Sequence, residues 1–321
     1  MKSLNLNSMS VKQILDIEKD IQDLNIQGAT NVAIATVEGM KIFIEESNIS
    51  DKELFYKELE RVGYKLANAR LNEPLARNAV KYITHMFKNH FSDLHSLNDM
   101  KQQVNEYCDE YLFKIADSKR SIVELGVPYV RHFENVLTHC HSSTAVTIIK
   151  EIAQGKPSFD VVCTETRPRF QGRTTAKSLL EAGISTTLIA DSAAESFTIG
   201  RGSVPIDAVF IGCDEITMDG FCINKIGSWG IAVAANYSGT PVYIVSPLLK
   251  VNPEITHRDI SIEIREDHEL WSDAPKGLKM FNPAFEIIDN RLITGFMTEF
   301  GIIKPEEVSD IVKQKYTWLF D

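Results

Sequence analysis

The sequence predicts an α/β fold in which a mostly helical N-terminal domain, residues 1–125, precedes a Rossmann-like domain with a mainly parallel sheet, residues 126–321. Two observations predict this division. Up to about residue 125, apolar side chains recur at helical spacing, and beyond it short apolar runs alternate with helical segments, as in βαβ units. A length of 321 residues, 44% apolar and 24% charged, suits two packed domains.

Three amphipathic segments make the N-terminal part helical. The first covers residues 11–21, where apolar side chains fall near one face. Ser50 followed by Glu53 has the spacing of a capping box and predicts that a second helix begins there. The third segment is longer and covers residues 97–115.

The second half contains five apolar runs that we expect to be strands, at residues 135–138, 159–164, 186–190, 208–212 and 241–245. Candidate helices between these runs cover residues 142–154, 174–181, 193–198 and 228–237. Ligands of such sheets bind beyond the carboxyl ends of the strands. The residues that follow each run are therefore the first candidates for a functional site.

Charge and cysteine content exclude several classes of partner. The net charge is −10, from 34 basic and 44 acidic side chains, which opposes general binding to nucleic acid or to anionic membranes. No apolar run reaches the roughly 18 residues of a membrane span, and the first residues lack the apolar region of a secretory signal. Five cysteines without paired spacing suit a reducing compartment. We expect a cytoplasmic protein with no membrane or nucleic-acid partner.

Cys140 follows the first predicted strand and is the first candidate reactive group. Ser142 or Ser143 can cap the next helix, which would place the thiol near a positive dipole end that favours the thiolate. The alternative is a small buried apolar residue. His139 and His141 point to opposite sides of the pleat from Cys140, so we expect no shared metal ion.

A second candidate group is the loop after the second predicted strand. It contains Arg167, Arg169 and Arg173 beside Gln171 and Gly172, in an otherwise acidic protein. Guanidinium groups and backbone N–H groups at a helix start are what a phosphate monoester needs. A solvated charged loop is the alternative, but three arginines in one such loop favour phosphate binding.

Asp214 follows the fourth predicted strand, and Asn224 and Lys225 precede the helix expected at 228–237. Asp214 could serve as a general acid or base, while Lys225 is a second candidate phosphate or oxyanion contact. A helix cap, or an ion pair between these two residues, is an equal alternative. Dinucleotide, P-loop and hydrolase-elbow motifs do not occur. The residues predict an enzyme or binding protein for a small phosphorylated molecule.

Four segments resemble signature blocks of one known superfamily: residues 138–142 (THCHS), 164–172 (TETRPRFQG), 212–217 (GCDEIT) and 223–227 (INKIG). That superfamily joins ribose-1,5-bisphosphate isomerase, methylthioribose-1-phosphate isomerase and the alpha, beta and delta subunits of translation initiation factor 2B. Residues 282–286 and 298–303 are similar to its carboxyl-terminal blocks, so the match covers most of the chain.

The first two blocks look most like those of the ribose-1,5-bisphosphate isomerases. This resemblance implies an aldose–ketose isomerase that forms ribulose 1,5-bisphosphate in a nucleoside monophosphate salvage route related to AMP metabolism, without metal or cofactor. It implies that Cys140 transfers the carbon-bound proton and that Asp214 handles the oxygen protons. It also implies a homodimer or homohexamer. The implied substrate-binding residues are Gly28, Ala29, Arg70, Arg167, Gln171, Asn224, Lys225 and Lys250.

The sequence departs from the isomerase pattern at several positions. Gln27 stands where the isomerases have arginine, as in the initiation-factor relatives. Arg70 and Lys250 are kept while their neighbours differ, and Cys213 replaces an alanine. Two alternatives therefore stay open. One is a non-catalytic regulatory subunit that binds a nucleotide or sugar phosphate, and the other is a methylthioribose-1-phosphate isomerase.

Overall fold

The computed structural model describes residues 8–321, which form two compact units. The helical unit contains the described residues up to Asp117, together with Leu249–Pro253 and Val312–Asp321. The second unit contains Ser118–Leu248 and Glu254–Ile311. The predicted domain boundary after residue 125 lies inside α5 (Leu97–Val130), a helix that the two units divide between Asp117 and Ser118.

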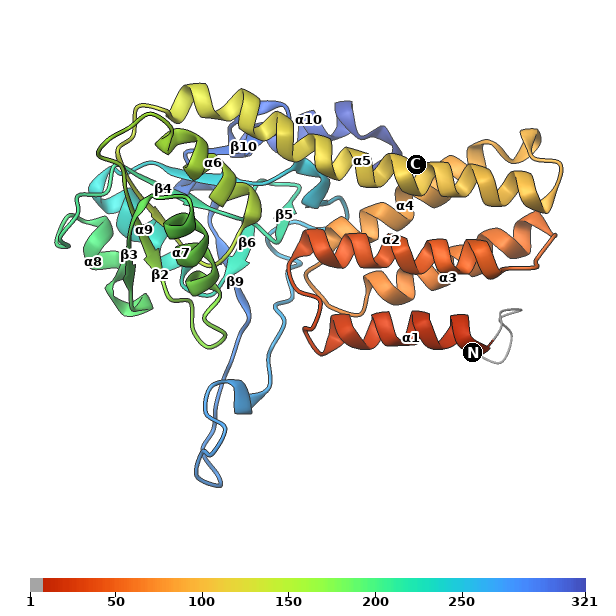
Figure 1. The fold of residues 1–321 in the computed structure, drawn as a ribbon, viewed down its shortest axis with the longest axis horizontal. Helices are drawn as coiled ribbons and strands as arrows, with labels where there is room; N and C mark the ends of the chain where they lie inside the picture. The colour runs from red at the N-terminus through yellow and green to blue at the C-terminus, as the bar shows by residue number, and fades with distance from the viewer. Residues whose placement is uncertain (1–7) are drawn as a thin grey trace. The chain divides into compact units, whose positions relative to one another are not determined.

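Figure 1 shows the helices of the helical unit. They pack around an aromatic core. In the core, the rings of Phe43 and Phe55 lie 5.5 Å apart and those of Phe55 and Phe87 lie 5.6 Å apart. The helices of this unit are α1 (Ser8–Gln22), α2 (Ala29–Glu46), α3 (Lys52–Ala67), α4 (Pro74–Asn89) and the first part of α5, with the short strand β8 (Val251–Asn252) and the end of α10 (Val308–Lys315).

The predicted start of α3 at Ser50 is wrong by one residue. The Asp51 carboxylate accepts the Leu54 N–H at 2.8 Å and caps the helix. A serine hydroxyl can accept the same bond. The carboxylate also places a negative charge at the positive end of the helix dipole, which a serine cannot do.

The second unit contains a seven-stranded sheet in the order β11-β10-β7-β4-β1-β2-β3. All neighbouring pairs are parallel except β10 and β11, so the predicted Rossmann-like α/β fold is confirmed. The five predicted strands are present, as are the four predicted helices. The strands are β1 (Asn135–Thr138), β2 (Asp160–Thr164), β3 (Ser185–Ile189), β4 (Ala208–Ile211), β7 (Val242–Val245), β10 (Gly295–Thr298) and β11 (Gly301–Ile303). The helices are α6 (Ser143–Ala153), α7 (Gln171–Glu181), α8 (Ala194–Thr198) and α9 (Ser228–Ser238).

Central strands of this sheet are buried on both faces, which explains why their sequences are continuous apolar runs. Every residue of β4 is buried, and Val136 of β1 and Phe210 of β4 belong to the same core cluster. A smaller antiparallel sheet pairs β6 (Cys222–Lys225) with β5 (Glu215–Thr217) and with β9 (Phe285–Ile288). Within residues 8–321, no helix combines the length and the apolar character needed to cross a bilayer.

One close approach between α7 and β2 requires a glycine. A Cβ atom on Gly172 would lie 1.8 Å from the carbonyl oxygen of Thr164 and 3.0 Å from the hydroxyl of Thr166. The first turn of α7 therefore touches the backbone at the end of β2, and this contact places the loop between them.

We expect Gly172→Ala to lower the free energy of unfolding by about 1–3 kcal/mol, because the added methyl forces α7 away from β2. Thermal denaturation of the purified protein measures the change. Thr174→Ala, at an exposed position of the same helix, should alter stability by less than about 0.5 kcal/mol. Equal stability of the two variants would contradict the close contact.

Candidate active site

The carboxyl ends of neighbouring strands deliver the candidate residues to one edge of the seven-stranded sheet (Figure 1). Cys140 lies two residues beyond β1, and Asp191 lies two residues beyond β3. The arginine-containing loop follows β2, and Asp214 follows β4. Lys225 ends β6 of the smaller sheet.

Cys140 has a left-handed backbone conformation, with φ +65°, which is unusual for a residue with a side chain. Its N–H donates to the Thr166 hydroxyl at 3.0 Å, and its carbonyl accepts the Thr175 hydroxyl at 2.8 Å. On the next residues, the Ser142 hydroxyl caps α6 by accepting the Ala145 N–H at 3.3 Å. Bonds from both sides thus hold the strained residue in place.

A line of buried hydrogen bonds continues from Thr166 to the turn before α9. The hydroxyls of Thr166 and Thr164 lie 3.2 Å apart, and the Thr164 hydroxyl lies 2.6 Å from Nδ1 of His139. Nε2 of His139 lies 2.8 Å from the Ile226 carbonyl. Burial lowers the pKa of His139 to about 4, so the ring is neutral near pH 7. Nε2 must donate to the carbonyl, and Nδ1 therefore accepts from Thr164.

The two histidines beside Cys140 serve different neighbours. Nδ1 of His141 lies 2.9 Å from the Thr175 hydroxyl, while His139 contacts Thr164 and Ile226. Over residues 8–321, no group of three or more His, Cys, Asp or Glu side chains is arranged to hold a metal ion.

Charges around the thiol influence its ionisation. Burial raises the pKa of Cys140 to about 11; Lys225 lowers it, and the carboxylates of Asp214 and Asp191 raise it. The expectation that the helix terminus makes a thiolate is therefore wrong, because desolvation outweighs it. Lys225, Asp214 and Asp191 are thus the charged groups that act on the Cys140 thiol. Among the five cysteines, all within the described residues, Cys140 is the one that is not fully buried.

Asp191 holds the loop that follows β2, a role that sequence reasoning did not assign. Its two carboxylate oxygens accept the N–H groups of Thr166 at 2.7 Å and Arg167 at 2.6 Å. Thr166 and Phe170 of this loop also have left-handed backbones, with φ +63° and +58°. The signal in the sequence is the position of Asp191, directly beyond a strand at the ligand-binding edge.

The three arginines predicted to bind phosphate each contact acceptors of the protein. Arg167 donates to the Leu270 carbonyl at 3.4 Å, and its guanidinium carbon lies 5.1 Å from the centroid of the Phe170 ring. Arg169 pairs with Glu269 at 3.3 Å. Arg173 pairs with Glu165 at 3.0 Å. Its guanidinium carbon lies 3.8 Å from the centroid of the Phe170 ring. Gln171 is the first residue of α7 and lies between Arg169 and Arg173.

Asn224 and Lys225 are fixed by the turn that leads into α9. The Asn224 amide donates to the Ser228 hydroxyl at 2.8 Å, and that hydroxyl donates to the Lys225 carbonyl at 2.6 Å. The Lys225 ammonium lies 4.5 Å from the centroid of the Phe285 ring. Asp214 is placed by its N–H, which donates to the Ile223 carbonyl at 2.9 Å.

The N-terminus of α9 already holds an internal anion. One carboxylate oxygen of Glu286 accepts the N–H groups of Gly227 at 2.6 Å and Trp229 at 2.7 Å. Sequence reasoning missed Glu286 because it lies on β9, far along the chain. Because Glu286 occupies the start of α9, the side chain of Lys225 is the group next to it that remains for an anionic ligand.

Four further residues implied by the resemblance belong to the helical unit. Gly28, with φ +82°, is the N-cap of α2, and Ala29 is the first residue of that helix. Arg70 forms a buried ion pair with Glu73 at 2.8 Å, and Lys250 ends a short 3₁₀ turn. Their part in ligand binding stays a prediction from the sequence.

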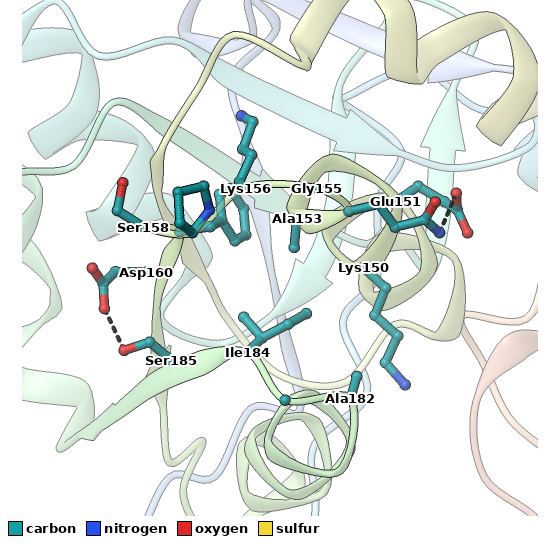
Figure 2. A pocket seen from close by; sticks show the side chains of 14 residues that line it. Lys150, Glu151, Ala153, Gly155, Lys156, Ser158, Asp160, Ala182, Ile184 and Ser185 are labelled. Atoms are coloured by element: carbon teal, nitrogen blue, oxygen red, sulfur yellow. Dashed lines mark hydrogen bonds between the residues drawn. The ribbon is translucent and has the colours of Figure 1, made fainter.

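A separate pocket of about 820 Å³ lies at the other end of the strands (Figure 2). It is lined by the turn between α6 and β2 and by the turn between α7 and β3. Lys150 and Lys156 are balanced there by Glu151 and Asp160, and Figure 2 shows Asp160 bonded to Ser185. None of the predicted site residues line it.

Known proteins are similar to this chain along nearly its whole length. Ribose 1,5-bisphosphate isomerase of Methanocaldococcus jannaschii is 33% identical over 314 residues, which cover 95% of this chain and 97% of that protein. The Pyrococcus furiosus protein of the same name is 30% identical over 324 residues, 98% of each chain. The crystal structure of 5-methylthioribose 1-phosphate isomerase from Pyrococcus horikoshii has a TM-score of 0.75 at 26% identity, and the alignment covers 96% of this chain and 87% of that one.

The model of the Initiation factor 2 subunit family matches residues 25–305, which include every strand-end residue discussed above. This match and the full-length relatives agree with the resemblance found in the sequence. The chain belongs to the initiation factor 2 subunit family.

Proposed function

We propose that this protein is an aldose–ketose isomerase that converts ribose 1,5-bisphosphate to ribulose 1,5-bisphosphate in nucleoside monophosphate salvage. The observation that carries the proposal is the position of Cys140 and Asp214 beyond the carboxyl ends of the neighbouring strands β1 and β4, with Lys225 among the charges that act on the thiol. Relatives similar over nearly the whole chain, named ribose 1,5-bisphosphate isomerase, support the choice of substrate.

The reaction needs one base and one acid. The anomeric oxygen of a sugar 1-phosphate is esterified, so the ring opens only if its oxygen is protonated while the C2 proton is removed. We assign the carbon-bound proton to Cys140, which moves it from C2 to C1 through an enol phosphate. Asp214 donates the proton to the ring oxygen and later accepts one from the C2 hydroxyl.

Cys140, whose pKa is about 11, acts as this base in its thiolate form, which the nearby charge of Lys225 favours. The negative charge of Asp214 is one of the causes that raise the pKa of Cys140, and the positive charge of Lys225 opposes it.

Polar groups around the pair would bind the rest of the sugar. In this proposal Lys225 and Arg167 contact phosphate, because charge-assisted bonds dominate the binding of a dianion. Gln171 and Asn224 contact hydroxyl groups. No step in this scheme calls on a metal or a cofactor.

Two alternatives differ in substrate or in chemistry. Methylthioribose 1-phosphate has a thioether where ribose 1,5-bisphosphate has a second phosphate, and a structural relative named for that substrate is 26% identical to this chain. Gln27, in place of the isomerase arginine, favours a regulatory subunit without turnover. The presence of Cys140 favours an enzyme.

We also propose a cytoplasmic location and assembly into a homodimer or homohexamer. The five free thiols suit a reducing compartment. Light scattering after gel filtration should give a mass of two or six chains, and a monomer at micromolar concentration would contradict the assembly.

Purified protein should convert ribose 1,5-bisphosphate, labelled with ¹³C at C2, to a ketone visible by NMR. Methylthioribose 1-phosphate in a parallel tube should give no ketone. Conversion of the thioether sugar alone would move the assignment to the other isomerase, and binding of both sugars without turnover would support the regulatory subunit.

Cys140→Ser should lower turnover by a factor of at least about 100, because a serine hydroxyl is a much weaker base than a thiolate. Calorimetry should find substrate affinity within a few fold of the original protein, since the phosphate contacts are intact. Substantial turnover by the serine variant would remove Cys140 from the mechanism.

The charges of Asp214 and Lys225, which act on the Cys140 thiol, give a second test that needs no substrate. Asp214→Asn should lower the pKa of Cys140 and speed its alkylation at pH 8, because a charge that raises the pKa is gone. Lys225→Met should raise the pKa and slow alkylation for the opposite reason. Rates of iodoacetamide modification between pH 7 and 11 measure both. Shifts in the same direction would contradict the arrangement of the three groups.

A further inference from the structure

Residues 254–284 form an arm between β8 and β9 that extends away from the sheets of the second unit (Figure 1). Its two segments pair near the base, where Arg265 N–H donates to the Asn282 carbonyl and Ala284 N–H donates to the Glu263 carbonyl, each at 2.8 Å. The arm carries a short 3₁₀ turn, Asp267–Glu269. This turn contacts the loop that follows β2.

Glu269 is the buried centre of that contact. Its side chain is only 7% exposed, and one oxygen accepts both Arg265 of the arm, at 2.5 Å, and Arg169 of the loop, at 3.3 Å. The other oxygen is buried without a hydrogen-bond partner. Burial raises the pKa of Glu269, but Arg265 and Arg169 outweigh this and lower it overall, so the carboxylate is ionised near neutral pH.

Arg169 is the partner that can leave. Its contact with Glu269 is the longer one, and its side chain is 35% exposed, against 17% for Arg265. If Arg169 moves to another anion, Glu269 keeps the short bond to Arg265, so no buried charge is left alone. Removal of Arg265 would instead leave Glu269 with a single, longer contact.

The position of Arg169 in the loop connects it to the candidate active site. Three residues before it, the Thr166 hydroxyl accepts the N–H of Cys140, and two residues after it Gln171 begins α7. The neighbouring Arg167 reaches the same arm through the Leu270 carbonyl. The Arg169 guanidinium thus belongs to the loop that contacts Cys140, yet it is held by a carboxylate.

We propose that Arg169 binds the second phosphate of the substrate and that Glu269 holds Arg169 until that phosphate replaces it. The proposal rests on the function proposed above. It assigns the enzyme's preference for a bisphosphate over a monophosphate to Arg169. Glu269 competes with the distal phosphate for one guanidinium. A sugar with a single phosphate leaves the ion pair intact and gains nothing from Arg169.

Calorimetry with two ligands, ribose 1,5-bisphosphate and ribose 1-phosphate, tests the exchange in the Cys140→Ser protein, where turnover does not interfere. Arg169→Ala should weaken bisphosphate binding about tenfold or more, the usual loss of one charge-assisted bond, and change ribose 1-phosphate binding less than twofold. Glu269→Gln should strengthen bisphosphate binding several fold and leave ribose 1-phosphate unchanged, because the competing charge is gone.

Lys177→Ala is the matched control for loss of one positive charge. Lys177 lies on α7 after the loop, with its side chain 79% exposed, and its removal should affect the two ligands equally and by less than twofold. Arg169→Lys keeps the charge and should recover part of the bisphosphate affinity. It remains informative if Glu269→Gln does not fold.

Equal losses for both ligands in Arg169→Ala, or no loss for either, would overturn the proposal. Failure of the broader function is distinguishable, because the original protein would then give no ketone from ribose 1,5-bisphosphate. An active isomerase whose bisphosphate affinity does not depend on Arg169 would reject only the exchange. Failure of the bisphosphate to bind at all would reject both.

Discussion

The candidate site depends on one line of buried hydrogen bonds, from the Cys140 N–H through Thr166, Thr164 and His139 to the Ile226 carbonyl. Because His139 is neutral and a carbonyl only accepts, every bond in the line has a single direction. The line joins the ends of β1 and β2 to the turn that carries Lys225. A change at any one of these groups leaves a buried polar atom unpaired, which costs more than the bond contributes.

Strain is concentrated at the same place. Cys140, Thr166 and Phe170 all have left-handed backbones, although none is a glycine. Such conformations cost on the order of 1–3 kcal/mol each and persist only where neighbouring contacts fix them. Asp191 fixes the loop through two backbone N–H groups, and Gly172 lets α7 begin against β2. The rigid sheet edge therefore supports an irregular segment that presents its side chains to a ligand.

Much of the fold follows from the sequence, because β1, β2, β4 and β7 are apolar runs that can hardly be anything other than buried strands. Strands β5, β6, β8, β9, β10 and β11 were missed. They are two to four residues long, and the pairing of β6 with β9 joins Cys222 to Ile288, a partner that no local pattern indicates.

The candidate site was predictable to a similar extent. Cys140 and Asp214 follow predicted strands and Lys225 precedes a predicted helix, so the order of elements along the chain is enough to place them. The acceptors of the arginines could not be inferred, since Glu269 is 100 residues from Arg169. The ionisation of Cys140 was also predicted wrongly. A helix cap is a local feature of the sequence, whereas burial of the thiol results from the whole fold.

The high pKa of Cys140 has a consequence for the durability of the protein. Peroxides attack thiolates, and a thiol with a pKa of about 11 is ionised in only about one molecule in ten thousand at pH 7. The other four cysteines are buried. The chain thus keeps a sulfur in its candidate site that is a poor target for oxidation.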